Sequence, residues 1–443
     1  MFFSLKGIVL LVTIHLSICI LIFISSSPHK NFLQVVEPSA VINSLENTIR
    51  RAEPKSILIP SKCKPHQSFY SPEEIKTIFK YQNYGPCITP TNDIISYTNN
   101  TLTIKCVNNS NPRYSFDESR QELFGGSKKP EIKWYNALPN LDSKQFLIIK
   151  CSKDSIYAQV FNRFNQKVSN SANEIRRKLR SNKKQMSVLL LVFDSISRFS
   201  FQRNLPKTAK FLYELKNNGE FRDDFDVYDF DKTPVPLPRT LWNMAQILYG
   251  KSWEELTKKY GSAYRFEKDE YYLKNQKKAI WSHFSSLGFV TMFSHNTVFD
   301  HLTYLFGRTI VAHHVFTNFW RYLWSIFNIH DIQDGQKCVG DRNNHDFSLD
   351  YTYQFFDNYK DNNKFAYVHL NAAHESTGNV RTIDEDLLRF LIKYLKMIQN
   401  RGENLGLFFC LIMGINNLKG PSGITGPFLS SIRQRLTLLC LKK

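Results

Sequence analysis

The sequence predicts an α/β fold with a mixed, mostly parallel sheet flanked by helices. Residues 188–193 form an unbroken apolar run, which is typical of a parallel strand covered on both faces. Strand-like apolar runs then alternate with helical patterns along the rest of the chain. The first run ends on Asp194, and open α/β sheets bind ligands beyond the carboxyl ends of their strands. Asp194 is therefore a candidate functional carboxylate.

The chain begins with an apolar segment, residues 8–24, followed by Ser-Ser-Ser-Pro. Its length lies at the short end for a membrane span and is somewhat long for the apolar part of a signal peptide. Residues 1–27 are therefore expected to be either a signal anchor that spans the membrane as a helix or a cleaved signal peptide. Residues 28–60 show little periodicity and are expected to form a stalk.

Residues 61–184 are predicted to form a cysteine-containing, β-rich N-terminal region. Strand-like runs occur at residues 102–106 and 146–151. The region holds four cysteines: Cys63, Cys87, Cys106 and Cys151. They predict two disulfide bridges among themselves in an oxidising compartment, and three pairings are possible. A basic helical stretch is expected near residues 161–185, just before the core.

Sequons at Asn99 and Asn108 indicate N-glycosylation. With the apolar segment and the cysteines, they predict a glycoprotein whose bulk is extracellular or lumenal. It would be membrane-anchored through a single N-terminal helix, or else secreted. The net charge of +19 is scattered along the chain, which favours a solvated surface, and it also suits an anionic glycan or an anionic ester substrate. Nucleic acid is not an expected partner of a secretory chain.

Residues 185–443 are predicted to form the α/β domain. Strands are expected at 188–193, 288–293, 365–370 and 407–413, and helices at 206–217, 240–249, 270–287, 346–359 and 384–399. The run at 407–413 is expected to be the final strand.

Three motifs stand out in this domain. The first is Asp194-Ser-Ile-Ser-Arg198, with Arg203 and Pro206-Lys-Thr208 after it. The second is Thr240-Leu-Trp-Asn243, which leads to Gly250-Lys-Ser252. The third is Ala373-His374-Glu375-Ser-Thr-Gly378, followed by Asp384-Glu-Asp386.

Together these motifs resemble the alkaline-phosphatase superfamily, with a sulfatase-like core, and most closely the nematode-expanded family of the domain of unknown function 229. The resemblance spans roughly residues 60–413, and Trp242 stands where the family has proline. It implies an alkaline-phosphatase-like fold that binds zinc or another divalent metal.

The resemblance also implies a role for each site residue. Asp194 and His374 would be metal ligands, and Thr240 would be the nucleophile and would also touch the metal. Asn243, one helical turn after Thr240, would donate a hydrogen bond to the transferring group. Each residue has a structural alternative: Asp194 or Thr240 as a helix cap, Asn243 as a surface residue, and His374 as a loop residue. His295, Asp300 and His301 lie at another strand end, without an assigned role.

The chain departs from the family pattern after residues 407–413. Where the family has Asp-His-Gly, this sequence has Gly414-Ile415-Asn416, and neither Asp nor His follows as far as Lys443. The domain is therefore expected to be C-terminally truncated, with an exposed sheet edge and metal ligands missing. Two functions stay open: a metal-dependent sulfatase- or phosphodiesterase-like hydrolase, or a catalytically inactive binding or scaffold ectodomain. A truncated gene model is a further alternative.

Overall fold

The computed structural model describes residues 83–88, 93–98, 101–107, 110–117, 130–179, 185–215, 220–221, 224–229, 240–252, 254–255, 279–297, 310–327, 338–373, 379–412 and 438–442. The expected anchor or signal peptide, the stalk, both sequon asparagines and Cys63 lie outside these residues. Within them, no helix is both long enough and apolar enough to span a membrane. The domain boundaries proposed from the sequence stay predictions.

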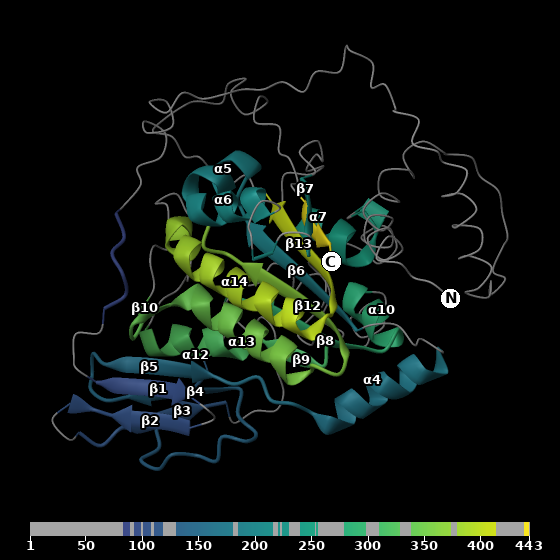
Figure 1. The fold of residues 1–443 in the computed structure, drawn as a ribbon. Coiled ribbons are helices and arrows are strands. Elements are labelled where there is room, and N and C mark those ends of the chain that lie inside the picture. The colour runs from purple at the N-terminus through teal and green to yellow at the C-terminus, as the bar shows by residue number, and fades with distance from the viewer. Residues whose placement is uncertain are drawn as a thin grey trace, which may run out of the picture.

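A seven-stranded sheet in the order β7-β14-β13-β6-β12-β8-β9 forms the centre of the described structure (Figure 1). Its strands are β6 (Met186–Asp194), β7 (Asp226–Asp229), β8 (Phe289–His295), β9 (His314–Phe316), β12 (Asn363–Leu370), β13 (Asn404–Ile412) and β14 (Leu438–Lys442). Five adjacent strands, from β13 to β9, pair in parallel, whereas β14 runs antiparallel to both β13 and β7. The predicted mixed, mostly parallel sheet is confirmed.

Strand β14 shows that one expectation was wrong. Residues 407–413 are not the last strand, because β14 pairs with β13 in a register that joins Phe408 to Cys440. β7 then pairs with the other side of β14. The edge of β13 is therefore covered rather than exposed.

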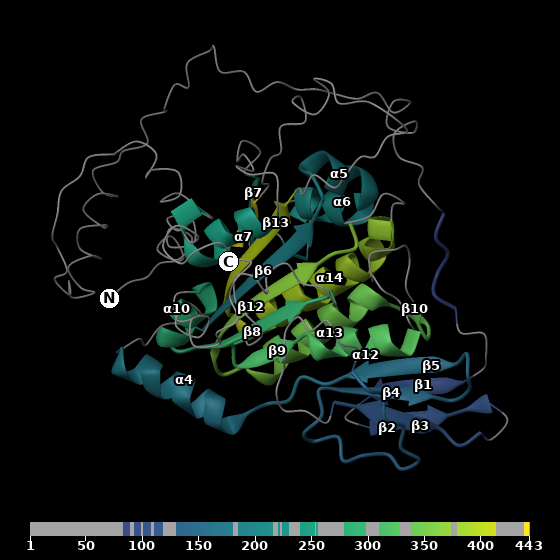
Figure 2. The same ribbon diagram turned by 180° about the vertical axis from the view of Figure 1, so that it is seen from behind.

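Helices cover both faces of the sheet (Figures 1 and 2). The helices α6 (Pro206–Glu214), α12 (Asn318–Phe327), α13 (Asn344–Asn358) and α14 (Ile383–Arg401) contribute to one apolar core. The helices α7 (Thr240–Tyr249) and α10 (Ile280–Ser286) contribute to a second core, on the opposite face. Two short helices, α5 (Arg198–Asn204) and the 3₁₀ helix η4 (Asn379–Thr382), complete this part.

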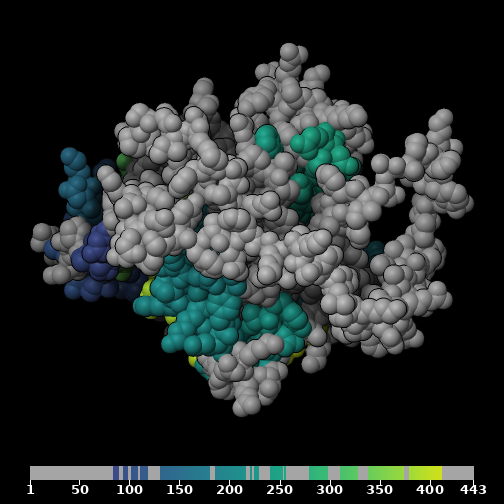
Figure 3. Space-filling model, turned by 90° about the horizontal axis from the view of Figure 1, so that it is seen from above, coloured from purple at the N-terminus to yellow at the C-terminus, as the bar shows by residue number. Residues whose placement is uncertain are grey.

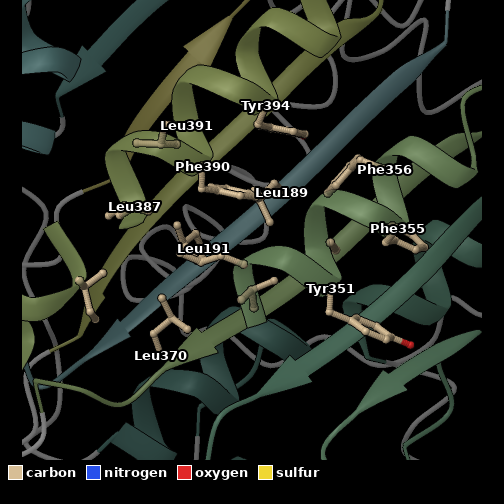
Figure 4. Close-up of a cluster of buried hydrophobic side chains, with 14 of the residues drawn as sticks. Leu189, Leu191, Tyr351, Phe355, Phe356, Leu370, Leu387, Phe390, Leu391 and Tyr394 are labelled. Carbon is tan, nitrogen blue, oxygen red and sulfur yellow. The ribbon is translucent and has the colours of Figure 1, made fainter. Parts of the chain in front are cut away.

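Strand β6 explains how the two cores are separated. Its odd-numbered apolar residues belong to the core under α13 and α14, and Figure 4 shows Leu189 and Leu191 near Phe390 of α14. Its even-numbered apolar residues, such as Leu190, belong to the core under α7 and α10. Each fully buried leucine contributes about 1.5–3 kcal/mol. Since side chains alternate along a strand, the even-numbered Asp194 at its end faces the α7 side.

The N-terminal region is rich in strands, as predicted. β1 (Ile94–Thr98) pairs with β2 (Thr101–Lys105), and β3 (Arg113–Phe116), β4 (Phe146–Lys150) and β5 (Ile156–Val160) form an antiparallel sheet. Phe146 of β4 packs against Phe319 of α12 with ring centroids 5.4 Å apart, so this sheet shares the main core. The basic helix α4 (Gln166–Lys178) follows β5.

Two disulfide bridges occur among the described residues. Cys106 pairs with Cys151, which confirms one bridge within the N-terminal region. Cys87 pairs with Cys338, at the start of the hairpin formed by β10 (Cys338–Val339) and β11 (Arg342–Asn343). The expectation that Cys87 pairs inside its own region was therefore wrong, because its partner lies 251 residues further along the chain.

Candidate functional site

The carboxyl ends of three adjacent parallel strands bring Asp194, His369 and His295 together. Asp194 ends β6, His295 ends β8, and His369 precedes the last residue of β12. The register places His369 beside both Val192 and His295. The exposed fractions of the three residues are 2% for Asp194, 0% for His369 and 3% for His295. Figure 3 looks down on this end of the molecule, where α5 and α6 lie.

Thr240 contributes a hydroxyl to this site from α7. Its Oγ1 donates a hydrogen bond of 2.8 Å to Oδ1 of Asp194, although the two residues lie 46 positions apart in the sequence. Thr240 is the first residue of α7, where backbone N–H groups and the helix dipole favour negative charge. The structure therefore brings together the predicted pair Asp194 and Thr240.

Asn243 lies on α7 one turn after Thr240 and is 4% exposed. The alternative that it is a surface residue is therefore wrong. It belongs to the buried face of α7, together with Met244 and Ile247.

The alternative that Asp194 caps the next helix is also wrong. The cap of α5 is Ser197, whose hydroxyl accepts a hydrogen bond of 3.1 Å from the N–H of Ser200. Between them, Ser195 has a φ of 59°, a left-handed conformation that costs a non-glycine residue about 1–2 kcal/mol. In the first motif, Asp194 is thus the carboxylate at the strand end, Ser195 forms a sharp turn and Ser197 caps the next helix.

Sequence reasoning missed His369. Its Nε2 lies 3.6 Å from Oδ2 of Asp194, and its Nδ1 lies 2.8 Å from the hydroxyl of Tyr367. In the sequence it sits inside an apolar run and reads as part of a buried strand. One signal was available in the sequence. Side chains of a strand alternate between its two faces, so His369 shares a face of β12 with Phe365 and Tyr367.

His295 stacks on His369 with ring centroids 4.2 Å apart and an angle of 13° between the ring planes. Its Nε2 lies 3.2 Å from Oδ1 of Asn371, in the loop after β12. Asn296 secures this loop, because its Oδ1 accepts a hydrogen bond of 2.8 Å from the N–H of Asn371. Asp300 and His301, singled out together with His295, lie outside the described residues.

The third motif divides between the described and undescribed parts of the chain. His374 lies outside the described residues, so its role as a metal ligand stays a prediction. Asp384 caps α6, since its carboxylate accepts hydrogen bonds from the N–H groups of Lys207 at 3.0 Å and Thr208 at 2.8 Å. Asp386 binds His345 Nε2 at 2.8 Å and joins α14 to α13. Both aspartates thus hold helices in place.

The atoms around Asp194 are suitable ligands for one divalent cation. A carboxylate, an imidazole and a hydroxyl are oxygen and nitrogen donors of the kind that zinc accepts. The register pairs Asp194 with Ile412 at the end of β13, and the sequence continues there with Met413-Gly414-Ile415-Asn416. This stretch, which lies outside the described residues, contains neither a carboxylate nor an imidazole.

The family described as "Protein of unknown function (DUF229)" matches residues 71–401. This match confirms the family resemblance drawn from the three motifs. No curated protein matches the chain in sequence.

Solved structures that match the chain in part include a periplasmic domain, a protein described as belonging to the alkaline phosphatase superfamily and a lipoteichoic acid synthase. The C-terminal periplasmic domain of EcEptC from Escherichia coli is 12% identical, with a TM-score of 0.35, over 59% of this chain and 73% of that one. A protein in the alkaline phosphatase superfamily from Vibrio parahaemolyticus is 11% identical, with a TM-score of 0.38, over 64% and 70%. The lipoteichoic acid synthase LtaP from Listeria monocytogenes is 10% identical, with a TM-score of 0.36, over 61% and 71%.

Proposed function

This chain belongs to the family described as protein of unknown function (DUF229), and we propose that its core is a hydrolase-like domain for phosphate or sulfate esters. The observation that carries the proposal is the hydrogen bond of 2.8 Å from Thr240 to Asp194. It joins an alcohol to a buried carboxylate at the carboxyl end of a parallel sheet, where such sheets bind ligands.

In the proposed reaction Thr240 is the nucleophile. A hydroxyl is a weak nucleophile until a neighbouring group activates it, and Asp194 Oδ1 orients the hydroxyl by accepting its hydrogen bond. The N-terminus of α7 stabilises negative charge on the ester oxygens, and Asn243 donates a hydrogen bond to the transferring group. Attack by Oγ1 on phosphorus or sulfur forms an ester at Thr240 and breaks the bond to the leaving oxygen, which takes up the proton lost by the hydroxyl and departs as the alcohol. Water then hydrolyses this ester and restores the hydroxyl.

A divalent ion such as zinc, when bound, would lower the pKa of the Thr240 hydroxyl and neutralise charge on the ester oxygens. Asp194 and Thr240 are the predicted ligands that the structure brings together, at 2.8 Å. His374 stays a predicted third ligand outside the described residues.

We place the protein outside the cytosol, as a glycoprotein that is membrane-anchored or secreted. Two observed disulfides support an oxidising compartment, and Asn99 and Asn108 are the expected glycosylation sites. The net charge of +19 suits an anionic ester or an anionic glycan as the partner.

A second candidate function is a binding or scaffold ectodomain without catalysis. The observation that favours it is the sequence after β13, where Gly414-Ile415-Asn416 stands in place of the Asp-His-Gly of the family pattern. With fewer anionic ligands the site would hold fewer metal ions, and a bound ester would lack part of the positive charge that its transfer requires.

Hydrolysis of aryl esters by the secreted chain separates the two candidates. An aryl phosphate, a bis-aryl phosphate and an aryl sulfate are offered in the presence of zinc. If Thr240 is the nucleophile, Thr240→Ala lowers turnover by about 10³-fold or more, because no other atom replaces the attacking oxygen. Thr240→Ser keeps a hydroxyl and should retain measurable turnover.

Undiminished turnover in Thr240→Ala would contradict the proposed mechanism. A native chain that binds the aryl esters but turns over none of them would support the binding ectodomain instead.

A further inference from the structure

We infer that His369 is a protein ligand of a single zinc-type ion, which it shares with Asp194 and Thr240. The inference rests on the proposed function only in placing the ion at Asp194. The three side chains come from β12, β6 and α7, and all three are at least nine-tenths buried. No motif in the sequence marks His369 for this role.

The distance between His369 and Asp194 is the first support. Nε2 lies 3.6 Å from Oδ2, which is longer than a hydrogen bond between a nitrogen and an oxygen. Two ligand atoms that each lie about 2.0–2.1 Å from one tetrahedral zinc are separated by about 3.3 Å. The observed spacing is therefore close to that of two atoms that share a cation.

Tyr367 is the second support. A metal-binding histidine almost always uses its other ring nitrogen for a hydrogen bond that fixes the ring orientation and the tautomer. The Tyr367 hydroxyl lies 2.8 Å from Nδ1 of His369. With Nδ1–H donating to this hydroxyl, Nε2 presents its lone pair towards Asp194. Tyr367 is thus a positioning residue for the ligand.

The number of ligands is the third support. Catalytic zinc sites commonly have three protein ligands and one open position for water or substrate. Among the described residues, Asp194, His369 and Thr240 are three such candidates: Thr240 Oγ1 lies 2.8 Å from Oδ1 of Asp194, and His369 Nε2 lies 3.6 Å from Oδ2. The predicted ligand His374 lies outside the described residues, so the inference concerns His369 and the described atoms around Asp194.

His295 provides a matched control. Its ring stacks on His369 at 4.2 Å and is buried to a similar degree. However, its Nε2 lies 3.2 Å from Asn371, in the loop after β12. His295 should therefore shape the wall of the site without binding the ion.

Without an ion, the same atoms can be explained as a structural chain from Asp194 through His369 to Tyr367. In that case His369 holds β6 and β12 together, and added zinc changes nothing at this site. Metal titration distinguishes the two explanations without any substrate.

The experiment uses the full chain, stripped of metal by a chelator and titrated with Zn²⁺ alone. Melting temperature reports binding, and Co²⁺ as a substitute reports the ligand set through its visible absorption. We expect zinc to raise the melting temperature of the native chain and of His295→Gln, but not that of His369→Gln. Tyr367→Phe should weaken zinc binding by about 10–100-fold, as loss of a hydrogen bond to a ligand typically does.

Equal stabilisation of His369→Gln and the native chain by zinc would overturn the inference, as would no stabilisation of the native chain. Equal loss in His295→Gln and His369→Gln would also overturn it. If His369→Gln does not fold in chelator, Tyr367→Phe decides the matter through its zinc affinity. Zinc binding without ester hydrolysis would leave this inference intact and contradict the proposed function.

Discussion

The carboxylate of Asp386 shows how one residue joins two helices of this fold. It accepts hydrogen bonds from His345 Nε2 at 2.8 Å and from Asn343 Nδ2 at 3.0 Å. Burial disfavours its charge, but the hydrogen bonds from His345 and Asn343 and the nearby Arg389 outweigh burial and lower the pKa of Asp386 below its ordinary value. The charged carboxylate therefore stabilises the folded state.

This lowered pKa predicts how stability depends on pH. The contribution of Asp386 is fully present above the pKa of an unfolded aspartate, about 3.9, and is lost as the pH falls through the lower folded pKa. We expect Asp386→Asn to lower the free energy of unfolding by about 1–3 kcal/mol at neutral pH, because the hydrogen bonds to a charged carboxylate are replaced by weaker ones to a neutral amide. The difference from the native chain should shrink below about pH 4.

Urea unfolding between acid and neutral pH measures this difference. The control is Glu385→Gln on the same helix, whose partner Lys207 is largely exposed, and it should leave the free energy of unfolding almost unchanged. A loss of stability in Asp386→Asn that is the same at every pH would contradict the assigned role of the charge.

At the scale of elements, the hairpin of β10 and β11 depends on one glycine. Gly340 has a φ of +65°, and a Cβ placed there would lie 2.5 Å from the ring of Tyr157 on β5. The ring has little freedom to move, since its hydroxyl donates a hydrogen bond of 2.8 Å to Asp93. The hairpin can therefore pack on the N-terminal sheet only without a side chain at this position.

Gly340→Ala should therefore destabilise the protein by more than the cost of the left-handed backbone conformation alone, because the added Cβ also meets the Tyr157 ring. The matched control is Gly402→Ala, with a φ of +61° and no atom within 4 Å of the added Cβ. We expect about 1–2 kcal/mol of destabilisation for Gly402→Ala, from the left-handed conformation, and clearly more for Gly340→Ala. Equal destabilisation by the two substitutions in thermal unfolding would show that the Tyr157 ring moves aside without loss of stability.

Local patterns predicted many elements of this fold. Strand β6 and the first residue of α7 follow from an apolar run and from a helical pattern beginning at Thr240. The partner of β13 could not be predicted in this way, because strand pairing is a long-range property and β14 carries no local sign of its neighbour. His369 was missed for a related reason: its role depends on the register with β6 and β8, which an isolated strand does not reveal.

At the scale of the whole molecule, Cys87–Cys338 ties the N-terminal region to the α/β core. It spans 251 residues, whereas Cys106–Cys151 spans 45. Spacing among the first four cysteines favoured pairing within their own region, and only the folded hairpin brings Cys338 to Cys87. The two regions are therefore joined covalently as well as through the apolar contacts of β4.

Removing each bridge by paired Cys→Ser changes should reveal this difference. Loop-closure entropy predicts that loss of Cys87–Cys338 costs about 1.5 kcal/mol more than loss of Cys106–Cys151, because its loop is longer. Chemical unfolding of the two double variants compares the costs, and peptide mapping without reduction verifies the pairing. A bridge from Cys87 to another cysteine of its own region would contradict the structure.

In the proposed reaction Thr240 attacks the ester from its position beside Asp194, to which its hydroxyl donates a hydrogen bond of 2.8 Å. The most direct measurement is mass spectrometry of peptides after rapid acid quenching of the chain with an aryl phosphate or an aryl sulfate. We predict that the peptide containing Thr240 gains the mass of one phosphoryl or sulfuryl group, and that Thr240→Ala gains none. Turnover of either ester with Thr240 unmodified, and equally fast turnover in Thr240→Ala, would contradict this role of Thr240.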